Sequence, residues 1–186
     1  MFPAWNELVN WYSYPGENAG FREEGLRRWR RGKANATKVK MSVANKVLVY
    51  RWYEEVWNKK REDVIDEMLS PDTVSFGLTD NPVEAVIGTE AFKKYWRKMI
   101  RIFPDIQVAV ESTIAEDDRV VARCSVHGTH LGEGLGVPPT GKKIHVTGVR
   151  ISTFKDGKVI EAWNHFDYLA VYRQLGLLPK TTRLET

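Results

Sequence analysis

The residues of this chain that could transfer protons gather in four short runs of its second half. The runs are HGTH at 127–130, PPTGK at 138–142, DGK at 156–158 and WNHFD at 163–167. They contain three of the four histidines, and His145 lies between two of them. Imidazole and carboxylate groups act as general acids and bases when they lie beside a substrate. Their recurrence at strand spacing among large apolar side chains predicts a small acid/base pocket in a curved sheet.

The elements that would position these groups follow from the hydrophobic period along the chain. A helical period predicts helices over 44–58, 62–69 and 89–103, with a short strand at 73–78 between the last two. From residue 106 the period changes to that of a strand, which predicts strands over 106–115, 119–131, 143–154 and 158–167. Asp156-Gly157 predicts a two-residue hairpin turn, and a short helix from Tyr168 ends at Gly176. This order predicts an α+β fold in which a bent sheet wraps over a helix and leaves a cone-shaped cavity.

Length and composition limit the class of protein. With 186 residues, 42% of them hydrophobic and 28% charged, the chain has the size and composition of one soluble globular domain. No apolar run approaches the roughly 18 residues of a membrane span, and no secretory signal is visible. The single cysteine, Cys124, excludes an internal disulfide and fits a reducing, cytoplasmic location. One cysteine and four dispersed histidines make a structural zinc site unexpected, so we expect no metal.

The whole net charge of +4 belongs to the N-terminal segment. Residues 1–40 contain eight Lys and Arg and four Glu, which leaves 20 charges of each sign for residues 41–186. We therefore expect a basic, aromatic-containing extension over 1–40 and a single domain over 41–186. The extension could be poorly ordered, could dock a partner or a second subunit, or could precede a natural start at Met41. Because the domain itself is neutral, we do not expect it to bind nucleic acid.

Several short motifs, in their order and spacing, resemble those of the SnoaL-like polyketide cyclase (ester cyclase) family, within the nuclear transport factor 2-like fold superfamily. The motifs are VIG at 86–88, FPD at 103–105, GTH at 128–130, PTGK at 139–142, DGK at 156–158, Trp163, Asp167 and QLG at 174–176. The resemblance covers residues 46–178. It implies a strongly curved mixed sheet with helices in its concave face, a site inside the cone that uses no cofactor, and a homodimer formed through the outer sheet face. Family members with known chemistry close a ring by aldol condensation of a polyketide ester.

The resemblance also gives positions for the proton-transfer groups. The family's acid/base carboxylate lies three positions before the aspartate that matches Asp167, and this chain has Asn164 there. A family histidine in the preceding strand matches Arg150. An amide does not take up a proton near neutral pH and arginine is always protonated, so both side chains are expected to bind ligand rather than transfer protons.

Asp167 and His130 remain as candidates for the catalytic groups. Asp167 could be a base with a pKa raised by apolar neighbours, or the N-cap of the next helix. His130 matches a family histidine and could exchange protons, or could be a hydrogen-bonded side chain at a strand end. Further candidates for ligand contacts or core packing are Trp163, His165, Trp96, Trp52, Trp57, Tyr95 and Met99. Strand alternation places Trp163, His165 and Asp167 on one face and Asn164 on the other, without saying which face is inward.

Two functions follow from these expectations. The first is a cofactor-independent enzyme of the cyclase or isomerase type, which transfers protons on a small hydrophobic carbonyl or polyketide-like substrate. The second, motivated by Asn164, is a non-catalytic small-molecule-binding protein with the same fold. A weaker third is binding of nucleic acid or an anionic membrane by the basic residues of 20–40.

Overall fold

The computed structural model of the chain describes residues 33–79, 81 and 83–178. The extension expected over residues 1–40 lies outside them, except for 33–40, which begin a helix. The chain divides into two units, 1–37 and 38–186, and every element that builds the candidate site belongs to the second. No helix among the described residues is long and apolar enough to cross a bilayer.

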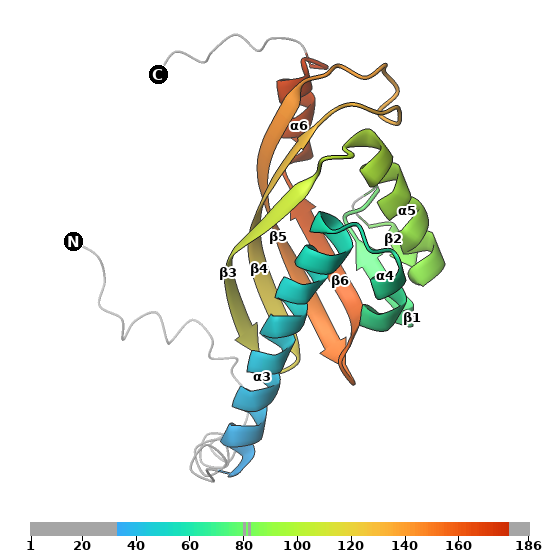
Figure 1. The fold of residues 1–186 in the computed structure, drawn as a ribbon. Helices are drawn as coiled ribbons and strands as arrows, with labels where there is room; N and C mark the ends of the chain where they lie inside the picture. The colour runs from blue at the N-terminus through green and yellow to red at the C-terminus, as the bar shows by residue number, and fades with distance from the viewer. Residues whose placement is uncertain (1–32, 80, 82, 179–186) are drawn as a thin grey trace, which may run out of the picture. The chain divides into compact units, whose positions relative to one another are not determined.

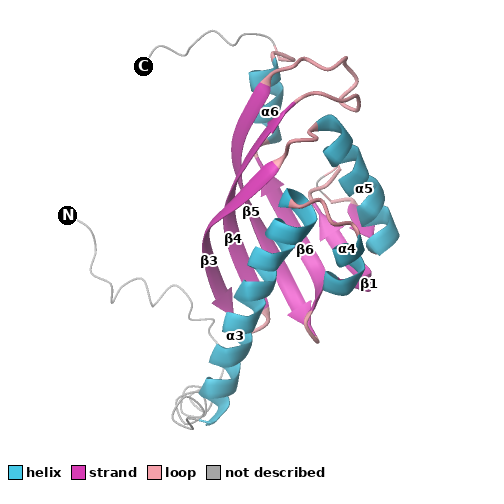
Figure 2. Ribbon diagram, in the orientation of Figure 1, coloured by secondary structure: helices cyan, strands magenta, loops and turns pink. Residues whose placement is uncertain are grey.

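In the described part of the chain, six strands form one mixed sheet in the order β2-β1-β6-β5-β4-β3. The strands are β1 (Leu69–Phe76), β2 (Ala85–Ile87), β3 (Gln107–Glu116), β4 (Arg119–Thr129), β5 (Lys143–Lys155) and β6 (Lys158–Phe166). β1 runs parallel to β6, and the other neighbours are antiparallel. The sheet bends and twists strongly in Figure 1. Figure 2 colours its strands magenta and the helices packed on it cyan. The α+β prediction is confirmed.

The helical elements are α3 (Lys33–Arg51), η2 (Trp52–Asn58), α4 (Asp63–Met68), α5 (Thr89–Ile102) and α6 (Tyr168–Leu175). The single helix predicted over 44–58 is thus an α-helix that continues into a π-helical stretch, η2. A π-helix turns less per residue than an α-helix, and in η2 both Trp52 and Tyr53 are buried together with Val56. The Asn58 carboxamide then bonds the backbone of Val108 in β3 at 2.8 and 3.1 Å, which fixes the end of η2 beside the sheet.

The start of the sheet differs from the sequence expectation. β1 begins at Leu69 rather than at 73, and its pairing with β6 is interrupted between Leu69 and Val74. Pro71 lies in this interruption and has no N–H to donate to a neighbouring strand. β2 was not predicted, because a strand of three residues is too short to show a period.

The hairpin between β5 and β6 is confirmed. Asp156 and Gly157 have φ angles of 52° and 77°, the pair of left-handed conformations that a type I′ turn requires. On β6, Asn164 is buried while Trp163 and His165 are exposed. The strand therefore turns Asn164 toward the helices and its two aromatic neighbours toward the outer face of the sheet.

Candidate functional site

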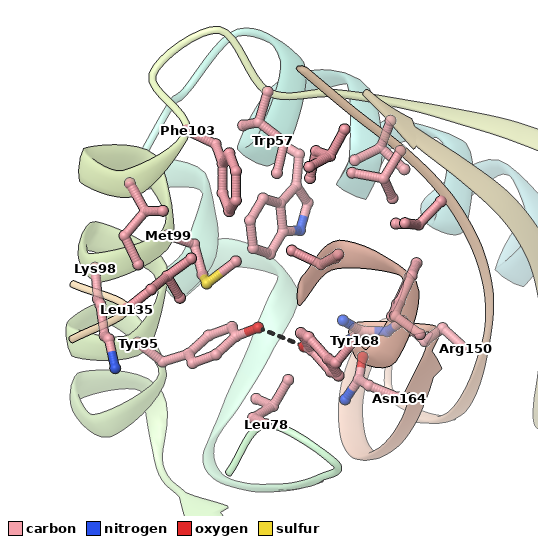
Figure 3. A pocket seen from close by; sticks show the side chains of 18 of the residues that line it. Trp57, Leu78, Tyr95, Lys98, Met99, Phe103, Leu135, Arg150, Asn164 and Tyr168 are labelled. Atoms are coloured by element: carbon pink, nitrogen blue, oxygen red, sulfur yellow. Dashed lines mark hydrogen bonds between the residues drawn. The ribbon is translucent and has the colours of Figure 1, made fainter. Parts of the chain in front are cut away.

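A cavity of about 730 Å³ lies between the inner face of the sheet and the helices. This size suits a drug-sized molecule. Apolar and aromatic side chains from η2, α5, α6 and β3–β6 form most of its wall, and Leu135 adds to the wall from the loop between β4 and β5. Figure 3 shows Lys98 and Met99 of α5 on one side of this space, with Arg150 and Asn164 on the other. The lining side chains with polar groups are Tyr53, Thr79, Tyr95, Lys98, Arg150, Asn164, Tyr168 and Tyr172.

Arg150 of β5 supplies a buried guanidinium to the cavity wall. Its side chain is 4% exposed, its Nε donates to Ser152 Oγ at 3.0 Å, and its Cζ lies 4.7 Å from the centre of the Trp52 ring. Burial lowers the pKa of Arg150, but an arginine stays protonated near neutral pH. The site therefore contains a positive charge held on an aromatic surface.

Asn164 lies directly across from Arg150, in the neighbouring strand β6. Its Nδ2 donates to the backbone oxygen of Phe76 at 2.8 Å, which fixes the orientation of the amide. The amide oxygen is left as an acceptor at the cavity wall. Arg150 and Asn164 together make one polar patch in an otherwise apolar wall.

Two tyrosines from different helices meet at the cavity. The hydroxyl of Tyr95 in α5 lies 3.0 Å from that of Tyr168 at the start of α6 (Figure 3). Burial is the main reason that the pKa of Tyr95 lies well above its usual value, and the neighbouring Tyr168 hydroxyl raises it further. Burial likewise raises the pKa of Tyr53. These phenols are therefore neutral near pH 7 and can donate hydrogen bonds to a ligand oxygen.

Sequence reasoning did not find Tyr53, Tyr168 or Lys98. Their positions carry no distinguishing signal, because an aromatic or lysine on an amphipathic helix is expected in the core or in solvent. Of the aromatic candidates, Trp57, Tyr95 and Met99 do line the cavity.

Asp167, His165 and Trp163 do not line this cavity. The Asp167 carboxylate accepts a hydrogen bond from the Ala170 backbone N–H at 2.8 Å, so it is the N-cap of α6. His165 and Asp167 line a second, more open hollow of about 610 Å³, together with Arg123 of β4 and Asn164. Trp163 stacks on Phe76 of β1, with ring centres 4.1 Å apart. These three residues are thus absent from the cavity wall that Arg150 and Asn164 share, although Asn164 also borders the second hollow.

His130 and Trp96 are also buried outside the cavity wall. The Thr140 backbone N–H donates to His130 Nδ1 at 3.2 Å, which assigns the ring proton to Nε2. Nε2 is buried and has no partner among the described groups. His130 packs 5.9 Å from the ring of Phe103, a lining residue, and so contacts the wall from behind. Trp96 donates to the Val56 backbone oxygen at 3.1 Å within the core.

The remaining motif residues join elements of the scaffold. Asp105 accepts from both the backbone N–H and the hydroxyl of Thr129, each at 2.6 Å. Partial burial acts to raise the pKa of Asp105, but the two hydrogen bonds from Thr129 act in the other direction, and the pKa lies below its usual value. The Gln174 carboxamide bonds the backbone of His145 at 2.7 and 2.9 Å, which attaches α6 to β5. Within the described residues, no group of three or more His, Cys, Asp and Glu side chains could hold a metal ion.

Known sequences resemble this chain over most of its described length. The model of the SnoaL-like polyketide cyclase family matches residues 47–175. Aklanonic acid methyl ester cyclase AcmA of Streptomyces galilaeus is 30% identical over 139 residues, which cover 72% of this chain and 92% of that protein. Nogalonic acid methyl ester cyclase of Streptomyces nogalater is 26% identical, over 64% of this chain and 89% of its own length.

Solved structures agree with this assignment. A SnoaL-like protein from Jannaschia sp. CCS1 superposes with a TM-score of 0.68 at 32% identity, over 75% of this chain and 96% of that one. AclR of Streptomyces galilaeus, for which a hydroxylase role has been suggested, gives a TM-score of 0.66 at 33% identity, over 77% and 87% of the two chains. From its motifs, its fold and these similarities, the chain belongs to the SnoaL-like polyketide cyclase family.

Proposed function

We propose that this protein is a cofactor-independent enzyme of the cyclase or isomerase type, which acts by proton transfer on a small hydrophobic carbonyl or polyketide-like substrate. The observation that supports this most is the polar patch of Arg150 and Asn164 in an apolar, aromatic cavity. A hydrophobic substrate would fill the cavity and direct a carbonyl oxygen at the patch. Membership of the family makes carbon–carbon ring closure the first reaction to test.

Arg150 would contribute by electrostatic stabilisation. Loss of a proton alpha to a carbonyl leaves an enolate, whose negative oxygen a fixed guanidinium stabilises in an environment with little water. The enolate carbon then attacks a second carbonyl, and the oxygen of that carbonyl takes up a proton to become a hydroxyl. We assign this donation to the neutral phenol of Tyr95 or Tyr168: one of these hydroxyls donates to the other, 3.0 Å away, and the remaining one can donate to the substrate.

Neither residue of the polar patch can be the base that takes the alpha proton. Asn164 does not accept a proton near neutral pH. Asp167 and His130 remain the sequence-derived proposals for acid/base groups, and both lie outside the cavity wall. An acid/base role predicts a loss of turnover of about 10²–10⁴-fold for Asp167→Asn and for His130→Ala.

The catalytic proposal can be tested by isotope exchange. The full chain would be incubated in D₂O with 1-tetralone, a simple ketone whose alpha protons exchange slowly without a catalyst, and with the methyl esters of aklanonic and nogalonic acid, the compounds in the relatives' names. We expect deuterium at the alpha carbon or a cyclised product, at a rate that Arg150→Met lowers about 10²–10³-fold. Arg123→Met is the matched control, because Arg123 is an exposed arginine paired with Glu111. Rates equal to the uncatalysed background for every compound would refute the proposal.

A non-catalytic binding protein is the second candidate. The observation in its favour is that the lining residues include no carboxylate and no imidazole. In that case a ligand would bind in the cavity and be recovered unchanged after long incubation, whereas conversion of the ligand would exclude this function.

We further propose that the protein is a homodimer joined through the outer face of the sheet. The resemblance to the family suggests this arrangement, and the outward position of Trp163, which is 36% exposed on β6, is consistent with it.

A further inference from the structure

Arg150 is a buried cation with unused hydrogen-bonding capacity. Ser152 Oγ bonds its Nε, and the face of the guanidinium rests on Trp52. Its Nη2 is buried and has no hydrogen-bond partner among the described groups. A donor in this position costs free energy unless something else supplies an acceptor.

No described residue neutralises this charge. Arg150 forms no ion pair with the described carboxylates, and the titratable groups that act on it are Tyr53, Cys124 and Tyr95. Burial raises the pKa of each of these three groups, so none of them is negative near neutral pH. Among the residues that line the cavity, Arg150 and Lys98 are the charged ones, and both are positive. The lining of the cavity is therefore electropositive.

We propose that the cavity takes its ligand as an oxyanion: a hydrophobic, ring-sized molecule whose carboxylate or ionised enol pairs with Arg150. A buried charge is strongly unfavourable without a partner, and an anionic oxygen would both neutralise Arg150 and accept from Nη2. The apolar wall opposite would hold the ring system, with Lys98 adding positive potential from the side of α5 (Figure 3).

This inference rests on the proposed function and narrows its substrate class. An acidic 1,3-dicarbonyl compound gives up its proton to water before or during binding, so the enolate alone occupies the cavity and the proton stays in the solvent. The enolate is already the nucleophile for ring closure. A cavity lined by Arg150 and Asn164, without a carboxylate or imidazole, suits such a substrate because the wall then needs no base.

Binding to the full chain tests the proposal, by calorimetry at neutral pH with three probes. These are 2-naphthoate, its neutral methyl ester, and 2-acetylindane-1,3-dione, whose enol is ionised at this pH. We expect at least one anion to bind about 10–100-fold more tightly than the ester. A preference for naphthoate assigns a carboxylate, and a preference for the dione assigns an enolate.

Three variants test whether Arg150 is the cause. Arg150→Met should abolish the preference for anions, and Arg150→Lys should keep part of it. Asn164→Asp should weaken anion binding, since it places a carboxylate across from Arg150 and supplies the missing counter-charge. Arg123→Met should bind as the unaltered chain does, and circular dichroism checks that each variant folds.

Two results would overturn the inference. One is equal affinity for the ester and both anions, and the other is an unchanged anion preference in folded Arg150→Met. The catalytic proposal fails separately. Anion preference with neither isotope exchange nor a cyclised product refutes catalysis alone, whereas exchange on the neutral ketone 1-tetralone without anion preference refutes the oxyanion inference alone.

Discussion

Asn164 and Asp167 lie three residues apart at the end of β6, and they face different surroundings. Asn164 lines the cavity and also borders the second hollow, whereas Asp167 caps α6 and borders the second hollow alone. Most motif residues behave like Asp167: Asp105, Thr129 and Gln174 hold strand ends and a helix in place. The motifs therefore identify the scaffold of the family, whereas the polar cavity residues Arg150 and Asn164 lie between the motifs.

The capping role of Asp167 gives a prediction in which two substitutions separate charge from geometry. Asparagine caps helices nearly as well as aspartate, so Asp167→Asn should change the free energy of unfolding by only a few tenths of a kcal/mol, and Asp167→Ala should lower it by about 1 kcal/mol. We also expect Asp167→Asn to keep the affinity of cavity ligands. Urea unfolding and calorimetry measure both quantities. A loss of turnover of about 10²–10⁴-fold in Asp167→Asn, with stability unchanged, would instead establish the carboxylate as an acid/base group.

Arg150 should matter for the ligand more than for folding. In Arg150→Met, the relief of burying an unpaired charge offsets the lost contact with Trp52, so we expect the free energy of unfolding to change by less than about 1 kcal/mol. Phe92→Ala, which empties a fully buried site in α5, should cost about 3–5 kcal/mol and serves as the comparison. If Arg150→Met were as destabilising as Phe92→Ala, Arg150 would be a structural residue.

At the scale of elements, the sequence was informative wherever a period or a turn residue acts locally. The strands β3–β6, the helices α4–α6 and the Asp156-Gly157 hairpin follow from such local signals. The sequence does not show which face of β6 points inward. Alternation defines two faces, and only the packing of η2 and α5 on the sheet turns the face with Asn164 toward the cavity. The π-helical stretch and the three-residue β2 depend on tertiary contacts in the same way.

Gly77, the residue after β1, lies so close to β6 that it fixes the position of the backbone at Asn164. Gly77 has a φ of 71°, and a Cβ added there would lie 2.0 Å from the Asn164 backbone oxygen. Gly77→Ala should therefore lower the free energy of unfolding by about 2–4 kcal/mol and weaken ligand binding, because β6 must shift at Asn164. Gly157→Ala is the control: its φ is 77°, but its surroundings are open, so it should cost about 1 kcal/mol. If the two variants lost equal free energy of unfolding, backbone conformation rather than contact with β6 would explain the need for glycine at position 77.

At the scale of the whole molecule, the cavity requires both layers. Tyr53 comes from η2, Tyr95 from α5 and Arg150 from β5, and none of these elements encloses the space alone. One architecture can host unrelated activities, so function has to be argued from the lining residues.

The proposed homodimer predicts a mass near twice the 21.4 kDa of one chain in light scattering. Trp163→Glu should shift the protein toward monomer, because a carboxylate placed on the outer face of the sheet would be desolvated at the interface. Val83→Glu is the control, since Val83 is 80% exposed in the loop before β2. A monomeric unaltered chain at micromolar concentration, or no effect of Trp163→Glu, would contradict this arrangement.

The charge distribution separates a basic N-terminal segment from a neutral domain. From Met41 onward the first buried side chain is that of Asn45, and every element around the cavity lies later in the chain, so a chain of residues 41–186 should keep the sheet, the cavity and the ligand affinity of the full chain. It should also lose the salt-sensitive attraction to polyanions that the net charge of +4 confers, since that excess lies within residues 1–40. Naphthoate binding tests whether the ligand affinity is kept, and heparin affinity as a function of salt tests whether the attraction to polyanions is lost. Heparin binding that survives the deletion would place a basic surface on the domain itself, and lost naphthoate binding would make the N-terminal segment part of the site.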